Sequence, residues 1–267
     1  MHWIYLSPHL DDVALSCGGL VWEQSRSGDK VEIWTVCGGD PPDTPLSPFA
    51  QSLHDRWRTG PDAVKDRRQE DRLSTQALGA SYRHLDWPDC IYRFHPESGL
   101  PVIQGEYDLF HARPEDTAIH DLTETLRRTL PKRVRLVSPM ALGDHIDHHL
   151  TRMAAERLGV PLLYYPDYPY ILHLPRVLEK MELSNLRRRI VNHEPPPGGE
   201  VVEQWARGKW SRMERAISEE GLLAWQKSIA AHHSQISTFW AGLPDMEMAI
   251  RNFWAGGGGR LWRIKIT

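Results

Sequence analysis

The chain alternates short apolar runs with longer stretches in which apolar residues recur at helical spacing. Residues 3–6 and 134–140 are two such runs, and they predict buried strands. Helical spacing follows each of them, at 13–22 and at 150–158. Similar signals predict strands at 30–37 and 81–87 and helices at 62–78 and 117–130. Strands that alternate with helices are typical of βαβ units, so we expect an α/β, Rossmann-like fold with a mainly parallel sheet and helices on both faces.

The pattern changes after residue 170. The later segments are predicted as a charged, partly helical stretch at 174–191, a Pro- and Gly-rich turn at 194–199, two helices within 203–233 broken around Gly221, and a strand at 260–266. We interpret residues from about 171 to 267 as a C-terminal cap of helices and a strand. It would belong to the same single domain, 1–267, as an α/β core of about residues 1–170.

Two stretches lack a regular pattern. Residues 40–60 are rich in Pro, Ser and Asp and predict a long loop after a strand. Loops of this length in compact domains are usually functional, so we expect it to overhang a site at that strand end. Residues 89–116 are predicted to be irregular, with a short hairpin.

Two polar clusters occupy strand-to-helix turns. Residues 7–12, Ser-Pro-His-Leu-Asp-Asp, follow the first strand, and residues 143–149, Gly-Asp-His-Ile-Asp-His-His, follow the strand at 134–140. In open α/β sheets, ligands bind outside the carboxyl ends of the strands. We therefore expect both clusters to meet at one edge of the sheet.

The residue types in these clusters favour a metal-dependent hydrolase. Catalytic zinc sites use three protein ligands and leave a fourth position to water. His9 and Asp12 are near enough to reach one ion, and one histidine of the second cluster would complete the set. If a helix begins near Asp147, His148 can face the ion and His145 can address a substrate oxygen. Spacing alone leaves open which histidine is the ligand.

Asp11 is left free for proton chemistry. A carboxylate beside an activated water, and not itself a ligand, can take the proton and deliver it to a leaving amine. A structural alternative is that His9, Asp11 and Asp12 only begin a helix, because Asp is a favoured capping residue. The second cluster at a matching turn argues against that alternative. We interpret His149 as structural, or as a residue that supports the ligands without contacting the metal.

The motifs resemble those of the PIG-L/LmbE-like zinc deacetylases. Pro8-His9-Leu10-Asp11-Asp12 resembles the family's P/A-H-x-D-D motif, and His145-Ile146-Asp147-His148 resembles its H-x-D-H motif. Further resemblances follow in the family's order: Arg67-Arg68-Gln69-Glu70 ahead of Leu78-Gly79, Trp87-Pro88-Asp89, the aromatic residues 165–170, and His233-Ser234-Gln235.

The resemblance implies removal of an acetyl group from an amino sugar, such as an N-acetylglucosaminyl (GlcNAc) group on a lipid, thiol precursor or glycoside. It implies His9, Asp12 and His148 as ligands of Zn²⁺ (or Fe²⁺), Asp11 as general base, His145 as the electrophilic or acid group, Asp147 as the partner that orients His145, and Arg67 as a substrate contact. The chain departs from members that carry a tyrosine just before H-x-D-H, because it has Gly143 and Asp144 there. The oxyanion role then falls more heavily on His145 and the metal.

Three further features are candidate substrate contacts. Trp57 is one of the tryptophans near the expected site that would stack on a pyranose ring, and Asp89 ends the Trp-Pro-Asp motif. The aromatic segment 164–170 alternates with Pro and Asp, which favours a loop that forms a pocket wall.

Composition narrows the classes of function. Of 267 residues, 40% are hydrophobic and 25% charged, which is ordinary for a globular protein. A net charge of −3 gives no electrostatic reason to expect a nucleic-acid partner. We expect no transmembrane segment and no signal peptide, hence a cytoplasmic protein. The scattered Cys17, Cys37 and Cys90 are interpreted as buried small residues, and 11 tryptophans would permit a homo-oligomer.

The sequence therefore predicts a zinc-dependent N-deacetylase of a GlcNAc-type substrate, with a small amino-sugar conjugate as its partner. One alternative is an amidase that uses the same metal site on a sugar-conjugate or other non-GlcNAc amide. A second is a carbohydrate-binding protein without turnover, although binding alone would not require Asp11.

Overall fold

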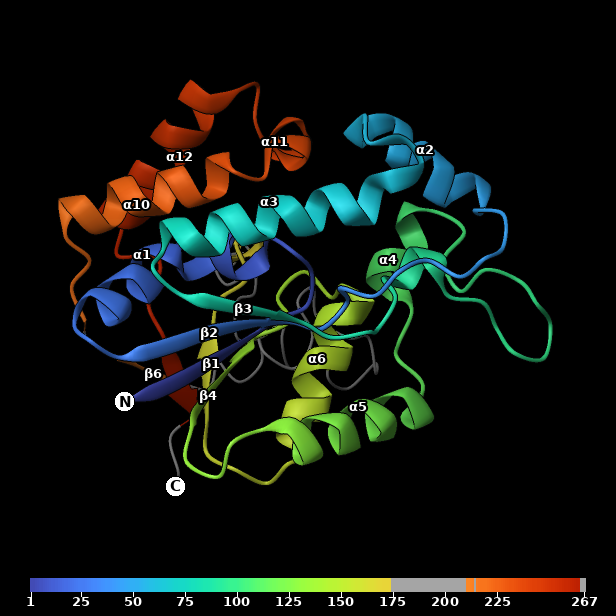
Figure 1. Cartoon of the computed structure of the whole chain (residues 1–267), viewed down its shortest axis with the longest axis horizontal. Helices are drawn as coiled ribbons and strands as arrows, with labels where there is room; N and C mark the ends of the chain where they lie inside the picture. Colours follow the sequence, from blue (N-terminus) through green and yellow to red (C-terminus); the bar gives the residue numbers. More distant parts are fainter. Residues whose placement is uncertain (174–209, 214, 265–267) are drawn as a thin grey trace, which may run out of the picture.

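A computed structural model of the chain describes residues 1–173, 210–213 and 215–264. In this part of the chain, seven strands form one sheet with the order β3-β2-β1-β4-β5-β7-β6 (Figure 1). The strands are β1 (His2–Ser7), β2 (Lys30–Thr35), β3 (Ser81–His84), β4 (Arg135–Pro139), β5 (Leu162–Tyr165), β6 (Trp210–Arg212) and β7 (Trp262–Ile264). The strands β1 to β5 pair in parallel, whereas β7 pairs antiparallel with both β5 and β6. The predicted, mainly parallel sheet is confirmed.

Helices cover both faces of this sheet. The described α-helices are α1 (Asp12–Arg26), α2 (Pro48–Trp57), α3 (Ala63–Ala77), α4 (Glu106–His111), α5 (Asp116–Thr129), α6 (Ile146–Glu156), α10 (Glu219–Ala230), α11 (His233–Phe239) and α12 (Leu243–Ala255). Short 3₁₀ helices span Gly60–Asp62, Cys90–Tyr92 and Tyr170–His173. In Figure 1, α1, α3 and α10 lie over one face of the sheet, and α5 and α6 lie over the other.

The sequence of β1 explains why both faces are covered. Successive strand residues point to opposite faces. Trp3 and Tyr5 belong to the core beneath α1 and α10, whereas Ile4 and Leu6 belong to the core beneath α5 and α6. All four side chains are buried. A continuous apolar run of this kind is typical of a parallel strand with helices on both sides.

The C-terminal elements pack directly on the N-terminal helix. Trp225 of α10 is fully buried, and its indole N–H donates to the carbonyl oxygen of Ala14 at 2.6 Å. Gly18 and Gly19 make this approach possible, because a Cβ at either position would lie 2.7–2.9 Å from the Trp225 ring. The Gly-Gly pair in α1 therefore allows the close packing of α10 on α1.

The predicted loop at 40–60 is wrong in part, because it contains the helix α2. The hydroxyl of Ser47 accepts a hydrogen bond from the N–H of Ala50, and Pro48 occupies the first helical position. Both are helix-start signals that the Pro- and Ser-rich composition concealed. Similarly, α4 lies within the stretch 89–116 that was predicted to be irregular, although a bridge between Phe94 and Pro101 confirms a hairpin-like pairing there.

The predicted break at Gly221 is also wrong, because this residue lies in the first turn of α10. A Cβ on Gly221 would lie 2.7 Å from a carboxylate oxygen of Glu23, so the glycine serves close packing on α1. Residues 210–212 form β6 rather than a helix, whereas the predicted C-terminal strand is confirmed as β7. The sequence pattern did not predict α12. The predictions for 174–191, 194–199 and 203–209 lie outside the described residues.

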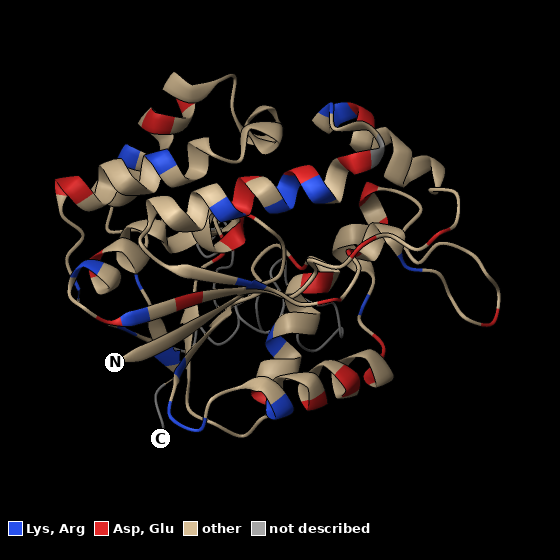
Figure 2. Ribbon diagram, viewed as in Figure 1, with Lys and Arg blue, Asp and Glu red and all other residues tan. Residues whose placement is uncertain are grey.

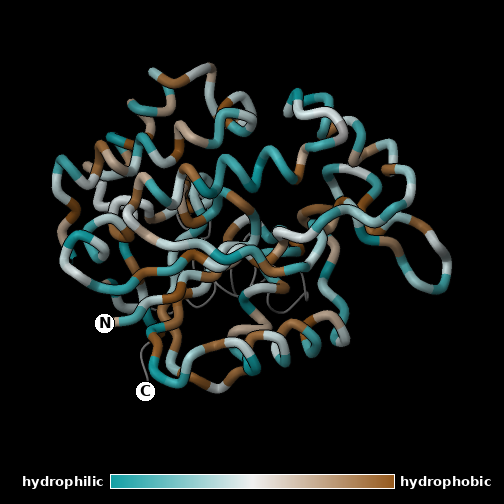
Figure 3. The backbone as a smooth tube through the Cα atoms, in the orientation of Figure 1, coloured by the Kyte–Doolittle hydropathy of each residue, from teal (hydrophilic) through white to brown (hydrophobic). Residues whose placement is uncertain are grey.

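The charged residues of two helices follow different patterns. Figure 2 shows acidic and basic residues interspersed along α3, whereas in α5 the acidic residues come first and the basic residues lie near its end. In Figure 3 the tube of α3 is largely hydrophilic. Several polar residues of α3 are nevertheless buried, namely Arg67, Glu70, Asp71, Ser74 and Thr75. Within the described residues, no helix has the length and apolar composition that a membrane span requires.

Candidate active site

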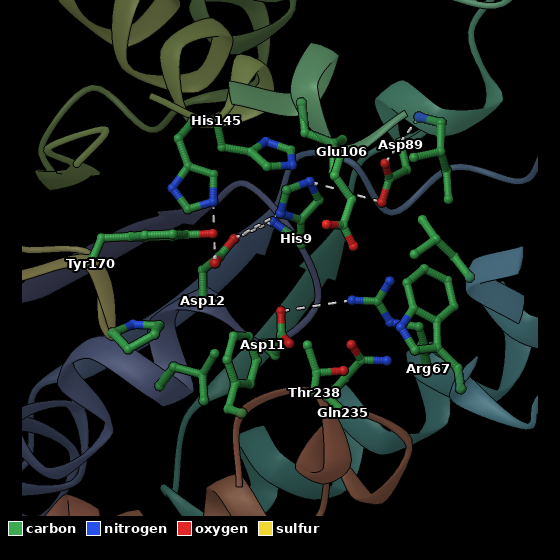
Figure 4. Close-up of a pocket in the computed structure, with 18 of the residues that line it drawn as sticks. His9, Asp11, Asp12, Arg67, Asp89, Glu106, His145, Tyr170, Gln235 and Thr238 are labelled. Atoms are coloured by element: carbon green, nitrogen blue, oxygen red, sulfur yellow. Dashed lines mark hydrogen bonds and ion pairs between the residues drawn. The ribbon is translucent and has the colours of Figure 1, made fainter. Parts of the chain in front are cut away.

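The two polar clusters meet at the carboxyl edge of the sheet, as predicted. β1 and β4 are adjacent and parallel, so the turns that follow them lie side by side. These turns form the floor of a cavity of about 310 Å³, which is lined by His9, Asp11, Asp12, His145 and His148 (Figure 4). Five of the six predicted metal and catalytic residues therefore face one pocket.

His9, Asp12 and His148 form a compact donor set. One Asp12 oxygen lies 3.2 Å from His9 Nδ1, and the other lies 3.3 Å from His148 Nε2. Bond lengths of about 2.0–2.1 Å in a tetrahedral site would put neighbouring ligand atoms about 3.3 Å apart. Each histidine thus lies at about this distance from one of the two Asp12 oxygens, and the N/O chemistry of the donors suits zinc. His145 is also close, since ring nitrogens of His9, His145 and His148 lie within 4.8 Å of one another.

Within this donor set, Asp12 and His148 each favour the charged form of the other. Burial alone would raise the pKa of Asp12, but His148 and His9 hold it well below its usual value. Conversely, burial alone would lower the pKa of His148, but the Asp12 and Asp167 carboxylates raise it to about 9. A cation between Asp12 and His148 would replace the proton that these carboxylates favour.

In both His9 and His148, the ring nitrogen that faces away from Asp12 contacts another carboxylate. His148 Nδ1 lies 2.6 Å from Asp167, whose other oxygen accepts the N–H of Leu142 at 3.0 Å. His9 Nε2 lies 3.3 Å from Asp147. Carboxylates in this position fix the orientation and tautomer of a metal-binding histidine.

The contacts of Asp147 differ from the prediction that its carboxylate orients His145. That carboxylate contacts His9, Arg93 and the N–H of Cys90. It is instead the backbone N–H of Asp147 that donates to His145 Nδ1, at 3.2 Å. His145 caps α6 and Asp147 lies in its first turn. An Asp147 oxygen lies within 4.8 Å of a His145 nitrogen, but the hydrogen bonds of the carboxylate run to His9, Arg93 and Cys90.

The backbone contact defines the state of His145. Because Nδ1 accepts a hydrogen bond, the neutral ring carries its proton on Nε2. Burial, reinforced by the nearby His9 and His148, holds the pKa of His145 well below its usual value. His145 is thus a neutral hydrogen-bond donor beside the donor set.

Asp11 is buried but lies outside the donor set. Its carboxylate faces Arg67, with Oδ1 3.7 Å from the guanidinium (Figure 4). Burial raises the pKa of Asp11, and Arg67 opposes that rise. Asp11 therefore has the position and the charge environment expected of a general base.

The other predicted substrate contacts also line the pocket. The Arg67 guanidinium lies 4.7 Å from the centre of the Trp57 ring, so Arg67 occupies one side of the ring that was expected to stack on a sugar. Asp89 lies 3.8 Å from His9 Nε2, and its other oxygen accepts the N–H of Ile91. The 40–60 segment contributes to the rim as predicted, although through α2.

Tyr170 was not singled out by the sequence, although the segment around it was expected to form a pocket wall. Its side chain extends toward Asp12 in Figure 4, and its ring lies edge-on to His148 with 6.2 Å between ring centres. Gly143 makes room for it, because a Cβ there would lie 2.4 Å from the ring. The chain has no tyrosine just before the H-x-D-H motif, but Tyr170 from a later segment packs against Gly143 at that position.

The remaining pocket walls come mostly from segments without a recognised functional motif. They include Glu106, Leu109 and Phe110 of α4 and Gln235, Thr238 and Phe239 of α11. Only Gln235 belongs to a motif noted in the sequence. Short amphipathic helices give no local indication of which cavity they will line.

The three cysteines are free and buried, as predicted. Cys37 and Cys90 lie near the site, each grouped with Asp147 and one histidine within 4.8 Å. Burial raises the pKa of both thiols, so neither is disposed to form the thiolate that binds a metal.

Comparison with known proteins agrees with this architecture. A model of the PIG-L family, described as GlcNAc-PI de-N-acetylase, matches residues 4–158. A 2'-N-acetylparomamine deacetylase of Niallia circulans is 32% identical over 187 residues, which cover 63% of this chain and 67% of that protein. A second protein of that name, from Streptomyces fradiae, is 29% identical over 214 residues, or 78% and 71% of the two chains.

Solved structures share the fold along nearly the whole chain. A deacetylase of the teicoplanin biosynthesis pathway has a TM-score of 0.72 and 25% identity, covering 98% of this chain and 97% of its own. A zinc-inhibited form of a teicoplanin deacetylase has a TM-score of 0.71 and 24% identity, with the same coverage. The predicted α/β fold class is confirmed.

Proposed function

Because this chain belongs to the PIG-L family, we propose that it is a metal-dependent N-deacetylase of an amino-sugar conjugate. One observation carries the proposal. A compact donor set of His9, Asp12 and His148 shares a pocket with Asp11, a buried carboxylate outside that set. A site that only bound carbohydrate would have no use for that extra base.

His9, Asp12 and His148 would hold the ion, which we propose to be Zn²⁺, with Fe²⁺ as the alternative. When bound, the ion would supply Lewis acidity, lowering the pKa of a water at the open position to about 7 and polarising the acetyl carbonyl. A zinc-inhibited structure of a teicoplanin deacetylase is compatible with a metal site in this fold.

Asp11 would carry the proton. In the proposed hydrolysis, the water oxygen bonds to the acetyl carbon, and Asp11 takes the proton released from the water. The C–N bond then breaks with its electron pair on nitrogen, Asp11 returns the proton to that nitrogen, and a free amine leaves with acetic acid, which releases its own proton to become acetate. The raised pKa of Asp11 makes it a stronger base than an exposed aspartate, and Arg67 opposes its complete protonation.

His145 would stabilise the carbonyl oxygen as negative charge develops. Its depressed pKa favours the neutral ring, whose proton lies on Nε2. We therefore assign His145 the electrophilic role rather than that of a charged acid. One such donor is worth roughly 2.7–4 kcal/mol of transition-state stabilisation.

The substrate class follows from the pocket and the relatives. Trp57, Phe110, Tyr170 and Phe239 give the cavity aromatic walls, on which the apolar face of a sugar ring can lie. The two relatives are both named as 2'-N-acetylparomamine deacetylases. We therefore propose a GlcNAc-type ring linked to a second polar group, with 2'-N-acetylparomamine as the first compound to test.

The experiment is release of acetate from N-acetylated compounds by protein loaded with Zn²⁺, with a chelator control. The panel contains 2'-N-acetylparomamine, N-acetylglucosamine and a non-sugar acetamide. Asp11→Ala should abolish release while the bound metal persists, whereas Asp121→Ala, at an exposed position of α5, should match the wild type. Release from the acetamide alone would support the amidase alternative. Full activity of Asp11→Ala would refute the assignment of the base.

A further inference from the structure

Asp147 is the most enclosed charged group at the site. Its side chain has no exposed surface, yet it lies only 3.3 Å from His9 Nε2. Its carboxylate also accepts the N–H of Cys90 at 2.9 Å and forms an ion pair with Arg93. A buried carboxylate is stable only when its charge is paired and its oxygens are hydrogen-bonded, and here all three contacts come from other segments.

Arg93 provides the only positively charged guanidinium that contacts Asp147 in the described structure. It follows the short helix Cys90–Tyr92, whose first backbone N–H binds the same carboxylate. One short segment therefore supplies both the charge and a backbone donor. Together they fix where the Asp147 oxygens lie, and so the direction in which His9 Nε2 finds its acceptor.

This arrangement determines which ring nitrogen of His9 is available to bind a metal. With Nε2 directed at Asp147, Nδ1 faces Asp12 on the pocket side. If Arg93 were removed, Asp147 would keep an uncompensated buried charge and lose the contact that holds its side chain in place. His9 would then lose the fixed position of its acceptor, the Asp147 carboxylate, although His9, Asp12 and His148 would all still be present.

We propose that Arg93 is a positioning residue for the metal site, acting through Asp147 on His9. The inference rests on the proposed function, because it requires His9 to be a metal ligand. Arg93 does not line the active-site pocket and lies instead on a separate cavity with Tyr92, Phe94 and Arg113. A role in substrate contact is therefore not needed to explain its partial burial.

The test is the affinity for Zn²⁺ itself, measured by competition with a chromophoric chelator. Loss of a residue that orients a metal ligand typically weakens binding by about 10–100-fold. We expect a loss of this size in Arg93→Met, and a smaller loss in Arg93→Lys, which restores the charge but not the planar fork. Arg113→Met is the matched control, since Arg113 lies on the same cavity but pairs with Asp144.

A second readout separates positioning from general damage. At saturating Zn²⁺, the KM of Arg93→Met for the acetylated substrate should equal that of the wild type, because the residues that line the pocket are the same. Arg93→Gln, which keeps a donor without the charge, is the replacement if Arg93→Met does not fold. Its zinc affinity should fall between those of Arg93→Lys and Arg93→Met.

The outcomes are distinguishable. Wild-type protein that binds no zinc would overturn the proposed function and this inference with it. Tight zinc binding by the wild type and equally tight binding by the folded Arg93 variants would overturn this inference alone. Equal weakening in Arg113→Met would also overturn it, since the effect would then not depend on Asp147.

Discussion

Glu70 should be a main stabilising link between the core and the C-terminal helices. It lies on α3 with 2% of its surface exposed, and its carboxylate reaches the start of α11. One oxygen accepts the backbone N–H of Ser234 at 2.9 Å and the other accepts the Ser234 hydroxyl at 2.7 Å. His233 Nδ1 lies 2.8 Å from the same carboxylate, but its side chain is 80% exposed.

These contacts set the size of the expected effect. Glu70→Ala leaves two buried donors of Ser234 without an acceptor, at about 1–3 kcal/mol each. The exposed His233 adds little, because solvent screens its pairing. We therefore expect a loss of about 2–6 kcal/mol in the free energy of unfolding. Glu70→Gln keeps one oxygen acceptor and should lose about half as much.

Urea denaturation of the metal-free protein measures this loss, with Glu219→Ala as the control. Glu219 lies in the first turn of α10, pairs with Arg251 and is largely exposed, so its loss should cost less than about 1 kcal/mol. Because α11 carries Gln235, Thr238 and Phe239 into the pocket, KM should also rise in Glu70→Ala. Equal stability of the Glu70→Ala and Glu219→Ala variants would refute the reasoning.

Three further predictions concern the site. Arg67→Met removes the cation that opposes the raised pKa of Asp11. The base must be ionised, and its ionisation is lost as pH falls through its pKa, so the acid limb of kcat/KM should move to higher pH. Arg67→Lys should move this limb less. An unchanged limb in Arg67→Met would contradict the coupling between Arg67 and Asp11. Gly143→Ala places a Cβ 2.4 Å from the Tyr170 ring at a φ of +86°, and should cost about 2–4 kcal/mol in thermal unfolding; wild-type stability would show that the ring moves freely. Chelation should abolish acetate release and Zn²⁺ should restore it, whereas activity that survives complete removal of metal, checked by elemental analysis, would exclude the proposed metal role.

The edge of the sheet could be predicted because its signals are local. Residues 3–6 and 134–140 are continuous apolar runs, and each ends at a polar cluster. Parallel strands bring such turns to one edge, so the meeting of His9 with His148 follows from strand pairing alone. The helix start at Ile146 likewise explains why His148 faces the donor set and His145 caps the helix.

The contacts of Asp147 could not be predicted in the same way. Its closeness to His145 in sequence suggested a pair, but a side chain in the first turn of a helix points where packing allows. Here the partners are His9 and Arg93, which lie 138 and 54 residues away along the chain. The pocket walls from α11 depend similarly on the long-range contact of Glu70 with Ser234. No local pattern encodes either pairing.

The opposite pKa shifts of Asp11 and His145 follow from one arrangement of charges. Both groups are buried, and burial favours the neutral form of each, raising one pKa and lowering the other. They differ in their neighbours: Asp11 faces Arg67, which draws it back toward the ionised form, whereas His145 faces two histidines that keep it neutral. A metal cation at the donor set would act in the same two directions. Its binding would therefore strengthen the division of labour between a base and a neutral donor, so that the roles of Asp11 and His145 should persist even if the physiological ion is not zinc.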